Sequence, residues 1–408
     1  MRMRFGGKGK MDLQRDPADE DFRDEVRAFL ETDWVRAKLG ETPRPRGRDS
    51  FVLSASILGR KRWTAPGWPT QWGGANLSPV RRYILEEELV KARFPSTDRI
   101  AINLAGPVIY TFGTLEQKKR YLPKVLTGEE IWCQGFSEPE SGSDVNSLRT
   151  KAVRQGDFYV VQGRKLWTTN AHFADMMFGL VRTEIGDRRQ HGLTFMLIDM
   201  RQPGVSVRPI ITLDSRHHVN EVLLDEVRVP ISNVVGEVGR GWHNARFLLA
   251  NERVMVSQVP RARQSLAVLK LRAASAGPQG AKLIKEPGFQ RRLAQLEIDL
   301  LALEFTVHRV LHGSRDDPSI EPLACVLKFR AAEFRQRVSE LSVEALGDHG
   351  LTYYSSHPDD RSAPSSLPPG PDYAPLVVRE FLFNLSATIA AGTSEVQRNL
   401  IAGVALGL

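Results

Sequence analysis

The stretch that decides the fold consists of QGFSEPESGSD (134–144) and DFYVVQGRKLWTTN (157–170), joined by a short link. The first part is a turn-rich loop that offers hydroxyl and backbone N–H donors. These donors come from Ser137, Ser141, Gly142 and Ser143. The second part alternates polar and apolar residues and ends on Trp167, Thr168 and Thr169. Small donors beside a large flat ring favour a site for a planar, hydrogen-bonding cofactor.

Length and composition are those of a globular protein with two or three folding units. The chain has 408 residues, of which 41% are hydrophobic and 25% charged, and domains take roughly 100–200 residues each. No apolar run approaches the roughly 20 residues that cross a bilayer, and no signal peptide is visible. Two cysteines, Cys133 and Cys325, favour a reducing compartment. We therefore expect a cytoplasmic protein with no membrane segment.

The formal net charge is +8, which could serve nucleic acid or an anionic substrate. The lysines and arginines are scattered along the chain, without one dense stripe or interleaved aromatic residues. This distribution favours a solvated basic surface and argues against a nucleic-acid-binding one.

The first third of the chain reads as helical. Residues 1–10 are glycine-rich and basic, which predicts a disordered extension. Apolar residues at helical spacing then begin at Phe22, and residues 40–50 read as a loop. Further helices are expected over about 52–62, 79–93, 99–112 and 116–127, the last ending at Gly128. The sequence therefore predicts an N-terminal helical domain over residues 11–128.

Between residues 129 and 238 the segments are short and β-rich, and glycine and proline turns separate them. No strand–helix–strand alternation occurs, which favours a small antiparallel barrel or sandwich over a doubly wound sheet. Helices return over 239–408, and six apolar residues mark the seam of a bundle helix. These are Leu293, Leu296, Leu300, Leu303, Val307 and Val310. A further helix is expected over 321–347, a mobile loop over 355–375 and two last helices over 376–388 and 394–406.

Other cofactor and metal motifs are weak. No G-x-G-x-x-G follows a strand, so a Rossmann nicotinamide site is not indicated. His217 and His218 are adjacent, but no metal-ligand spacing supports them. Ser394 and Gln397 fit a capping box, followed by a buried face of Val396, Leu400 and Val404. Such a helix start presents N–H groups to an anionic cofactor group.

Three motifs together resemble signatures of the acyl-CoA dehydrogenase family. They are F-S-E-P-E-S-G-S-D, G-R-K-L-W-T-T-N and G-T-S-E-V-Q-R-N. The resemblance runs from about residue 12 to the C-terminus. It implies an α+β, mostly helical fold with an N-terminal helical domain, a central β unit and a C-terminal bundle. It also implies that FAD contacts Gln134, Phe136, Ser137, Gly142, Ser143, Trp167, Thr168, Thr169, Thr393 and Glu395.

The catalytic base is the decisive question. Many relatives carry a glutamate immediately before the G-T-S glycine, where this sequence has Ala391. A second family position for the base lies in an E-R pair, here Glu252 and Arg253. On one continuous helix, Glu252 would lie within an apolar stripe, which suits a general base of raised pKa and equally suits a buried ion pair. That stripe comprises Ala245, Leu248, Leu249, Val256 and Val259.

The resemblance favours catalysis and implies a reaction. Glu252 would take the α-proton of an acyl-CoA, FAD would accept the β-hydride, and the product would be a trans-2-enoyl-CoA. Ser143 and Arg253 would contact the substrate, and Arg253 would orient the base or the acyl chain. Members acting on bulky or dicarboxylic acyl-CoAs, such as pimeloyl-CoA or sterol side-chain thioesters, show the most similar combination of motifs. An electron-transfer flavoprotein or a similar acceptor would reoxidise the flavin.

The sequence also departs from the family. The R-x-x-F-G loop is replaced by AGPQGAKLIKEP (276–287), and Glu344 stands where relatives have glutamine. A homodimer or homotetramer is implied by the resemblance, and these losses suggest a heteromer completed by a paralogous subunit. The alternative function is a non-catalytic member, either a heteromer subunit or a DNA-associated flavoprotein.

Overall fold

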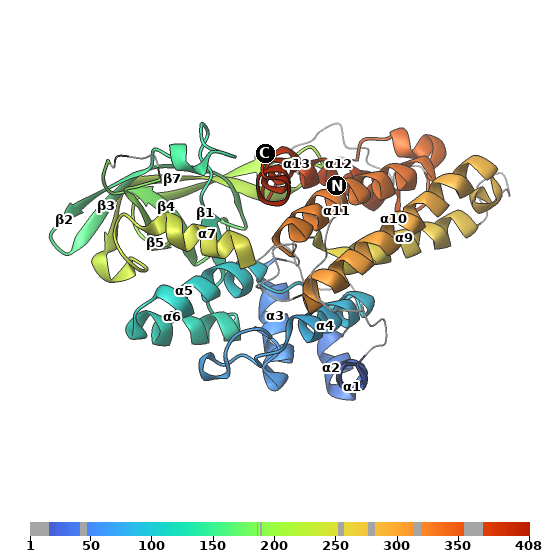
Figure 1. The fold of residues 1–408 in the computed structure, drawn as a ribbon, viewed down its shortest axis with the longest axis horizontal. Helices are drawn as coiled ribbons and strands as arrows, with labels where there is room; N and C mark the ends of the chain where they lie inside the picture. The colour runs from blue at the N-terminus through green and yellow to red at the C-terminus, as the bar shows by residue number, and fades with distance from the viewer. Residues whose placement is uncertain are drawn as a thin grey trace.

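The computed structural model describes residues 16–40, 47–185, 187, 190–251, 257–275, 282–313, 320–354 and 370–408. The predicted order of N-terminal helices, central β unit and C-terminal bundle is confirmed (Figure 1). The predicted extension (1–10), most of the predicted loop (355–375), Glu252 and Arg253 lie outside the described residues. Within the described ranges, no helix is both long and apolar enough to cross a membrane.

The N-terminal helices begin and end at recognisable caps. Asp16 accepts a hydrogen bond from Ala18 N at the start of α1, and Thr114 and Gln117 form a capping box on α6. As predicted, α6 ends at Gly128, whose φ of 73° suits glycine. The helices are α1 (Pro17–Glu31), α2 (Asp33–Leu39), α3 (Arg48–Leu58), α4 (Pro79–Lys91), a π-helical turn η3 (Ala101–Ala105), α5 (Gly106–Phe112) and α6 (Leu115–Thr127).

The β unit is one curled, mainly antiparallel sheet in the order β1-β4-β2-β3-β7-β6, with β5 paired to β4. Unlike the purely antiparallel prediction, β1 pairs with β4 in parallel. Every residue of β4 and β5 except the last is buried, because both faces of these strands are covered. The strands are β1 (Trp132–Gly135), β2 (Lys151–Gln155), β3 (Phe158–Thr169), β4 (Met176–Arg182), β5 (Leu193–Asp199), β6 (Val205–Ile211) and β7 (His217–Pro230).

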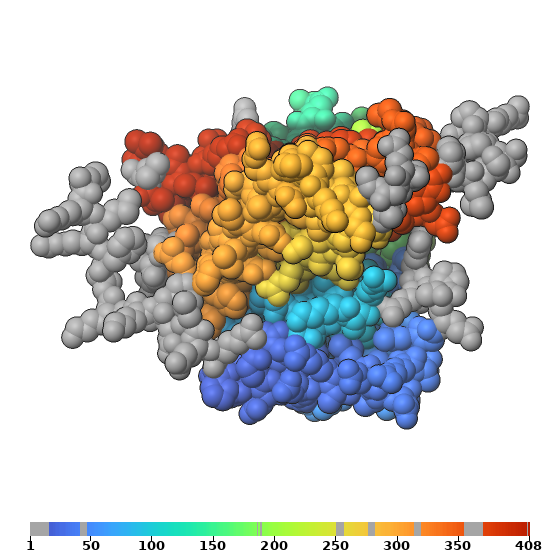
Figure 2. Space-filling view, turned by 90° about the vertical axis from the view of Figure 1, so that its right-hand side faces the viewer, coloured from blue at the N-terminus to red at the C-terminus, as the bar shows by residue number. Residues whose placement is uncertain are grey.

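The bundle packs on the N-terminal helices, as Figure 2 shows for α9 and α10. All six residues of the predicted α10 seam, from Leu293 to Val310, are buried in one apolar cluster. The helices after the sheet are α7 (Gly241–Asn251), α9 (Val259–Ala274), α10 (Pro287–His312), α11 (Ile320–Glu344), α12 (Ala374–Asn384) and α13 (Ser394–Ile401), the last followed by a π-helical turn (Ala402–Leu406).

Two local predictions are wrong. Part of the predicted loop at 40–50 is helical, because α3 already begins at Arg48. The predicted stripe from Ala245 to Val259 does not lie on one helix. Gln258 has a φ of 51°, a left-handed conformation that interrupts the helix, so Val259 belongs to α9. Leu249 is exposed, whereas Ala245 and Leu248 are buried.

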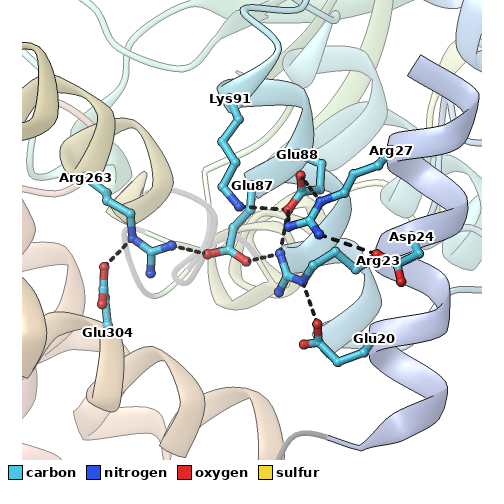
Figure 3. A network of polar contacts seen from close by, with 9 residues as sticks. All are labelled: Glu20, Arg23, Asp24, Arg27, Glu87, Glu88, Lys91, Arg263 and Glu304. Carbon is cyan, nitrogen blue, oxygen red and sulfur yellow. Dashed lines mark hydrogen bonds and ion pairs between the residues drawn. The ribbon is translucent and has the colours of Figure 1, made fainter. Parts of the chain in front are cut away.

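A network of charged side chains connects the N-terminal helices to the bundle (Figure 3). Glu88 on α4 accepts hydrogen bonds from Arg23 at 2.7 Å, Arg27 at 3.0 Å and Lys91 at 2.8 Å. The Glu88 side chain is 5% exposed. Burial alone would raise its pKa, but the three cations lower it to about 2.

The same network continues into the bundle. Glu87, next along α4, contacts Arg23 at 3.0 Å and Arg263 of α9 at 2.8 Å. Arg263 in turn contacts Glu304 of α10 at 2.5 Å. Charged contacts therefore connect α1, α4, α9 and α10 across the junction between the N-terminal helices and the bundle.

We expect Glu88→Gln to lower the free energy of unfolding by about 2–3 kcal/mol at pH 7, because buried Arg23 loses a partner. The Glu88 pKa is about 2 in the native state and ordinarily 4.5. Its stabilisation is thus fully present above pH 4.5 and is lost as pH falls towards 2. Denaturant unfolding should show the gap between wild type and variant shrinking over that window. Glu25→Gln, at an exposed pair with Lys61, should change stability by less than about 1 kcal/mol. An equal gap at every pH would contradict this.

Candidate active site

The two parts of the deciding stretch are joined by a buried ion pair that the sequence analysis missed. Lys165 of β3 is fully buried, and its Nζ donates to Glu138 Oε1 at 2.8 Å and to Leu180 O at 2.7 Å. Glu138 also accepts the backbone N–H groups of Arg149 at 2.6 Å and Thr150 at 3.0 Å. The loop at 136–144 is thereby held against β3.

Electrostatics favour the charged form of the Glu138 carboxyl. Burial alone would raise the pKa of the Glu138 carboxyl, but Lys165 and the N–H donors lower it. Burial lowers the pKa of Lys165, and Glu138 partly offsets that effect. A buried charge is tolerated when it is paired and fully hydrogen-bonded, as here.

The predicted loop residues fall into two groups. The ring of Phe136 is buried against Phe178 and Phe195, with centroids 5.8 and 6.3 Å apart, so its side chain belongs to the core. Gln134 and Ser137 are partly buried, and the Ser137 carbonyl accepts Leu166 N at 2.9 Å.

Gly142 and Ser143 form the exposed tip of the loop. A Cβ added at Gly142 would meet no atom within 4 Å. The Ser141 hydroxyl donates to Asp144 O at 2.8 Å and so stabilises the turn. The donors of this tip are therefore accessible to a ligand.

The end of β3 presents the predicted tryptophan and threonines. A bulge lies between Lys165 and Thr168, and Trp167 has a φ of 59° with its side chain 56% exposed. A positive φ is rare at a bulky residue, and the residues that do adopt it cluster at functional sites. Thr168 is buried, and its Oγ1 has no hydrogen-bond partner among the described residues, whereas Thr169 is exposed.

Asn220, which is fully buried, fixes this strand end. Its Nδ2 donates to the Thr168 carbonyl at 3.0 Å and lies 3.2 Å from His172 Nδ1. His217 Nε2 lies 2.6 Å from Asn220 Oδ1. Burial lowers the pKa of His172, and His217 adds to that effect. The hydrogen bonds of Asn220 therefore fix the backbone next to Trp167.

The adjacent histidines differ in their contacts, and His218 links the sheet to the bundle. Its Nε2 lies 2.9 Å from Asp214 Oδ2, and its ring lies 4.9 Å from that of Phe383 on α12. Figure 1 shows α12 and α13 at this end of the sheet. In the described ranges, no group of three or more His, Cys, Asp or Glu residues could hold a metal ion.

The predicted capping box at Ser394 is wrong. Thr393 is the N-cap of α13, with extended backbone, and its Oγ1 accepts Val396 N at 3.2 Å. Ser394 and Gln397 are the buried residues of the helix, in place of the predicted face, and Val404 is 49% exposed. Ser394 Oγ and Gln397 Oε1 lack partners among the described residues.

Lys328 of α11, also missed from the sequence, fixes the turn before this cap. Its Nζ donates to the carbonyls of Gly392 at 2.5 Å and Ala387 at 3.2 Å. Glu395 is exposed in the first turn of α13, where its own backbone N–H and the Thr393 side chain lower its pKa. A carboxylate so stabilised is a poor proton acceptor at neutral pH.

No base stands before the cap, since Ala391 occupies the position, with a φ of 55°. Glu252 and Arg253 lie outside the described residues. Burial raises the pKa of Asp98 to about 6. Its two oxygens, however, accept Ala101 N and Trp132 N, each at 3.0 Å. Asp98 therefore joins η3 to β1.

The described residues fit the predicted FAD. Trp167 offers an exposed flat ring, and the tip at Gly142 and Ser143 offers free donors. The Thr168 hydroxyl is a buried polar group without a partner among the described residues, and a bound ligand would satisfy it. The capped start of α13 supplies N–H groups for an anionic group.

Comparison with known proteins gives the same picture across the chain. Three family models match, described as acyl-CoA dehydrogenase N-terminal domain (residues 16–129), middle domain (133–227) and C-terminal domain (239–406). "Acyl-CoA dehydrogenase IpdE1" of Mycobacterium tuberculosis is 33% identical over 402 residues, covering 95% of this chain and 97% of the relative. "Acyl-CoA dehydrogenase FadE29" of the same organism is 29% identical, covering 96% and 97%.

Solved structures share the fold over almost the full length. The ChsE4–ChsE5 complex from Mycobacterium tuberculosis matches with a TM-score of 0.80 at 28% identity, covering 98% of this chain and 99% of the other. A structure described as "Tcur3481-Tcur3483 steroid ACAD" matches with a TM-score of 0.78 at 27% identity, covering 98% and 99%.

Proposed function

The chain belongs to the acyl-CoA dehydrogenase family, and on this premise we propose that it oxidises an acyl-CoA thioester to the trans-2-enoyl-CoA with Glu252 as the base. Enzymes of this family depend on FAD. When bound, FAD accepts the hydride that leaves the β-carbon. The carboxylate of Glu252 takes the α-proton, which the neighbouring thioester carbonyl acidifies.

The remaining residues bind and orient. Thr168 and Thr169 would donate to the flavin edge, and Trp167 would cover one side of the ring. Thr393 and Glu395 would lie at the anionic part of the cofactor, while Ser143 and Arg253 would contact the substrate. The observation that carries the proposal is the end of β3, where the exposed Trp167 adjoins the buried Thr168, whose hydroxyl has no partner in the described part of the chain.

Assignment of the base to Glu252 is supported by exclusion among rival carboxylates. Ala391 cannot take a proton. Both Asp98 oxygens are engaged by backbone N–H groups, and the pKa of Glu395 is lowered. The E-R pair is the family's alternative position for the base, and it is intact in the sequence.

We propose a bulky or dicarboxylic acyl group as the substrate class, with an electron-transfer flavoprotein or a similar protein as electron acceptor. Support for a bulky acyl group comes from the match to a structure described as a steroid ACAD. A second, paralogous subunit is proposed because AGPQGAKLIKEP (276–287) replaces the family loop, and a matching structure is a two-protein complex.

The test is anaerobic bleaching of the purified, flavin-loaded protein. We expect the yellow absorbance to fall on addition of an acyl-CoA from a panel of short, long, dicarboxylic and sterol-derived esters. Butyryl, octanoyl, pimeloyl and sterol side-chain thioesters would form such a panel, with free CoA as the control. Colour that no thioester bleaches, alone or with the co-purified partner, would favour the non-catalytic alternative.

A further inference from the structure

A large cavity lies between the N-terminal helices and the start of the bundle. Its volume is about 910 Å³, and its walls come from α4, η3, α5, α7, α9 and the loop at 63–68. This volume is near the upper end of the roughly 300–1,000 Å³ typical of small-molecule sites. The cavity therefore has room for a group much bulkier than a short linear chain.

The cavity is close to the candidate active site. One wall, formed by η3 and α5, shares an apolar cluster with Trp132 and Phe136 of the cofactor loop region. The lining also includes Phe247 of α7, which packs against the same cluster, and Arg261 of α9. These two residues flank Glu252 in the sequence. The cavity thus adjoins α7, which ends at Asn251, one residue before Glu252 in the sequence.

The described lining has an unusual excess of positive charge. It contains four arginines, Arg82, Arg93, Arg99 and Arg261, against one glutamate, Glu86. Glu86 is already hydrogen-bonded to Arg99 Nη2. Positive charge therefore predominates in the described lining, which favours an anionic ligand.

Arg261 is the lining arginine that lies on α9, the bundle helix. Across the described ranges it makes no hydrogen bond or salt bridge. Its side chain is accessible to solvent, yet burial lowers its pKa, and Arg99 lowers it further. Arg261 and Arg99 both line the cavity, with Glu86 beside Arg99. A carboxylate between them would form the charge-assisted pair that guanidinium groups favour.

Beyond the charged groups, the lining mixes apolar and aromatic residues with polar ones such as Thr64, Asn103 and Gln264. Trp68, Tyr110 and Phe247 are among the residues that could cover a ring system. The cavity therefore combines a surface for a bulky apolar body with a cluster of cations. This pairing suits a ligand that is carbocyclic and carries one acidic group.

We propose that this cavity receives the acyl part of the thioester and that Arg261, together with Arg99, binds a carboxylate on that part remote from the thioester. The inference rests on the proposed function and defines its substrate class as carboxylate-bearing acyl-CoAs. Arg261 is a specificity-determining residue in this reading. The phosphates of CoA are the other possible source of anionic charge, and the experiment separates the two.

The experiment compares thioesters that differ only in the remote carboxylate. Pimeloyl-CoA is paired with heptanoyl-CoA, and 3-(4-carboxycyclohexyl)propanoyl-CoA with 3-cyclohexylpropanoyl-CoA. Dissociation constants are measured calorimetrically with the corresponding trans-2-enoyl thioesters, which cannot be dehydrogenated at that bond, and kcat/KM is measured with the saturated esters. We expect wild type to prefer the acid of each pair by about 10- to 100-fold, as charged hydrogen bonds allow.

Variants of one residue then locate the preference. Arg261→Gln should abolish the preference for the acid, and the change should appear in KM and in the dissociation constant, while kcat for the uncharged ester is retained. Arg261→Lys should keep part of the preference. Arg36→Gln, on the exposed face of α2, is the matched control and should keep it fully. Because Arg261 has no described partner, Arg261→Gln should unfold at the wild-type temperature.

Three results would overturn the inference. The first is equal affinity of wild type for both esters of a pair, and the second is a preference that survives Arg261→Gln. The third is a loss of affinity in Arg261→Gln that is equal for both esters, which would assign the arginines to the CoA phosphates. Failure of the proposed function looks different, because the acid would then bind with preference while no ester bleached the flavin.

Discussion

Glu252→Gln should keep the yellow colour of the protein and lose its response to acyl-CoA. The amide has nearly the shape of the carboxylate but cannot take the α-proton. Since general-base catalysis contributes roughly 10²- to 10⁴-fold, we expect the rate of anaerobic bleaching to fall by about that factor. Binding of the thioester should change by less than about tenfold, because the proton is transferred only in the transition state.

Two comparisons make this result specific. Glu31→Gln, at the exposed end of α1, should bleach at the wild-type rate. Glu252→Asp should retain intermediate activity, since a carboxylate remains but stands one methylene further from the substrate. If Glu252→Gln bleached as fast as wild type, the base would lie elsewhere.

Elements with regular apolar spacing were predictable from the sequence. The seam of α10 is an example, because each of its six residues faces the bundle interior and is buried. The end of α6 was predictable for a different reason, since Gly128 takes the left-handed conformation that closes a helix. The division into helices, sheet and bundle followed from the same local signals.

Features set by distant contacts were not predictable in this way. A left-handed Gln258 carries no local signal, so the helix from Ala245 was predicted to continue to Val259. Thr393 and Ser394 are equally good caps by type, and only the backbone of Thr393 decides between them. Lys328 donates hydrogen bonds to carbonyl groups more than fifty residues away along the chain.

Lys165 had a signal that alternation could have revealed. Burial in β3 falls on Tyr159 and Val161, and counting on by two reaches Gly163 and Lys165. A lysine on the inward face of a strand requires an anion nearby. Glu138, in the turn-rich loop, was the candidate, and the ion pair between them is what holds the two signatures together.

Breaking that ion pair should have the largest effect on stability. Lys165→Met leaves the buried Glu138 carboxylate without its cation, and loss of one partner of a buried pair costs about 3–5 kcal/mol. Denaturant unfolding of the apoprotein should show this loss. Flavin retention should fall as well, because the loop that carries Ser137 and Ser143 is no longer held against β3.

The double variant separates charge from shape. Lys165→Met with Glu138→Gln removes both charges and should be more stable than Lys165→Met alone, by about 1–3 kcal/mol. The double variant should still be less stable than wild type. The Glu138 carboxylate accepts hydrogen bonds from Arg149 N and Thr150 N. The amide of Glu138→Gln has a donor NH₂ group in place of one of these acceptor oxygens. A Lys165→Met protein as stable as wild type, with flavin bound, would mean that the loop is held by its backbone contacts, such as Leu166 N to Ser137 O.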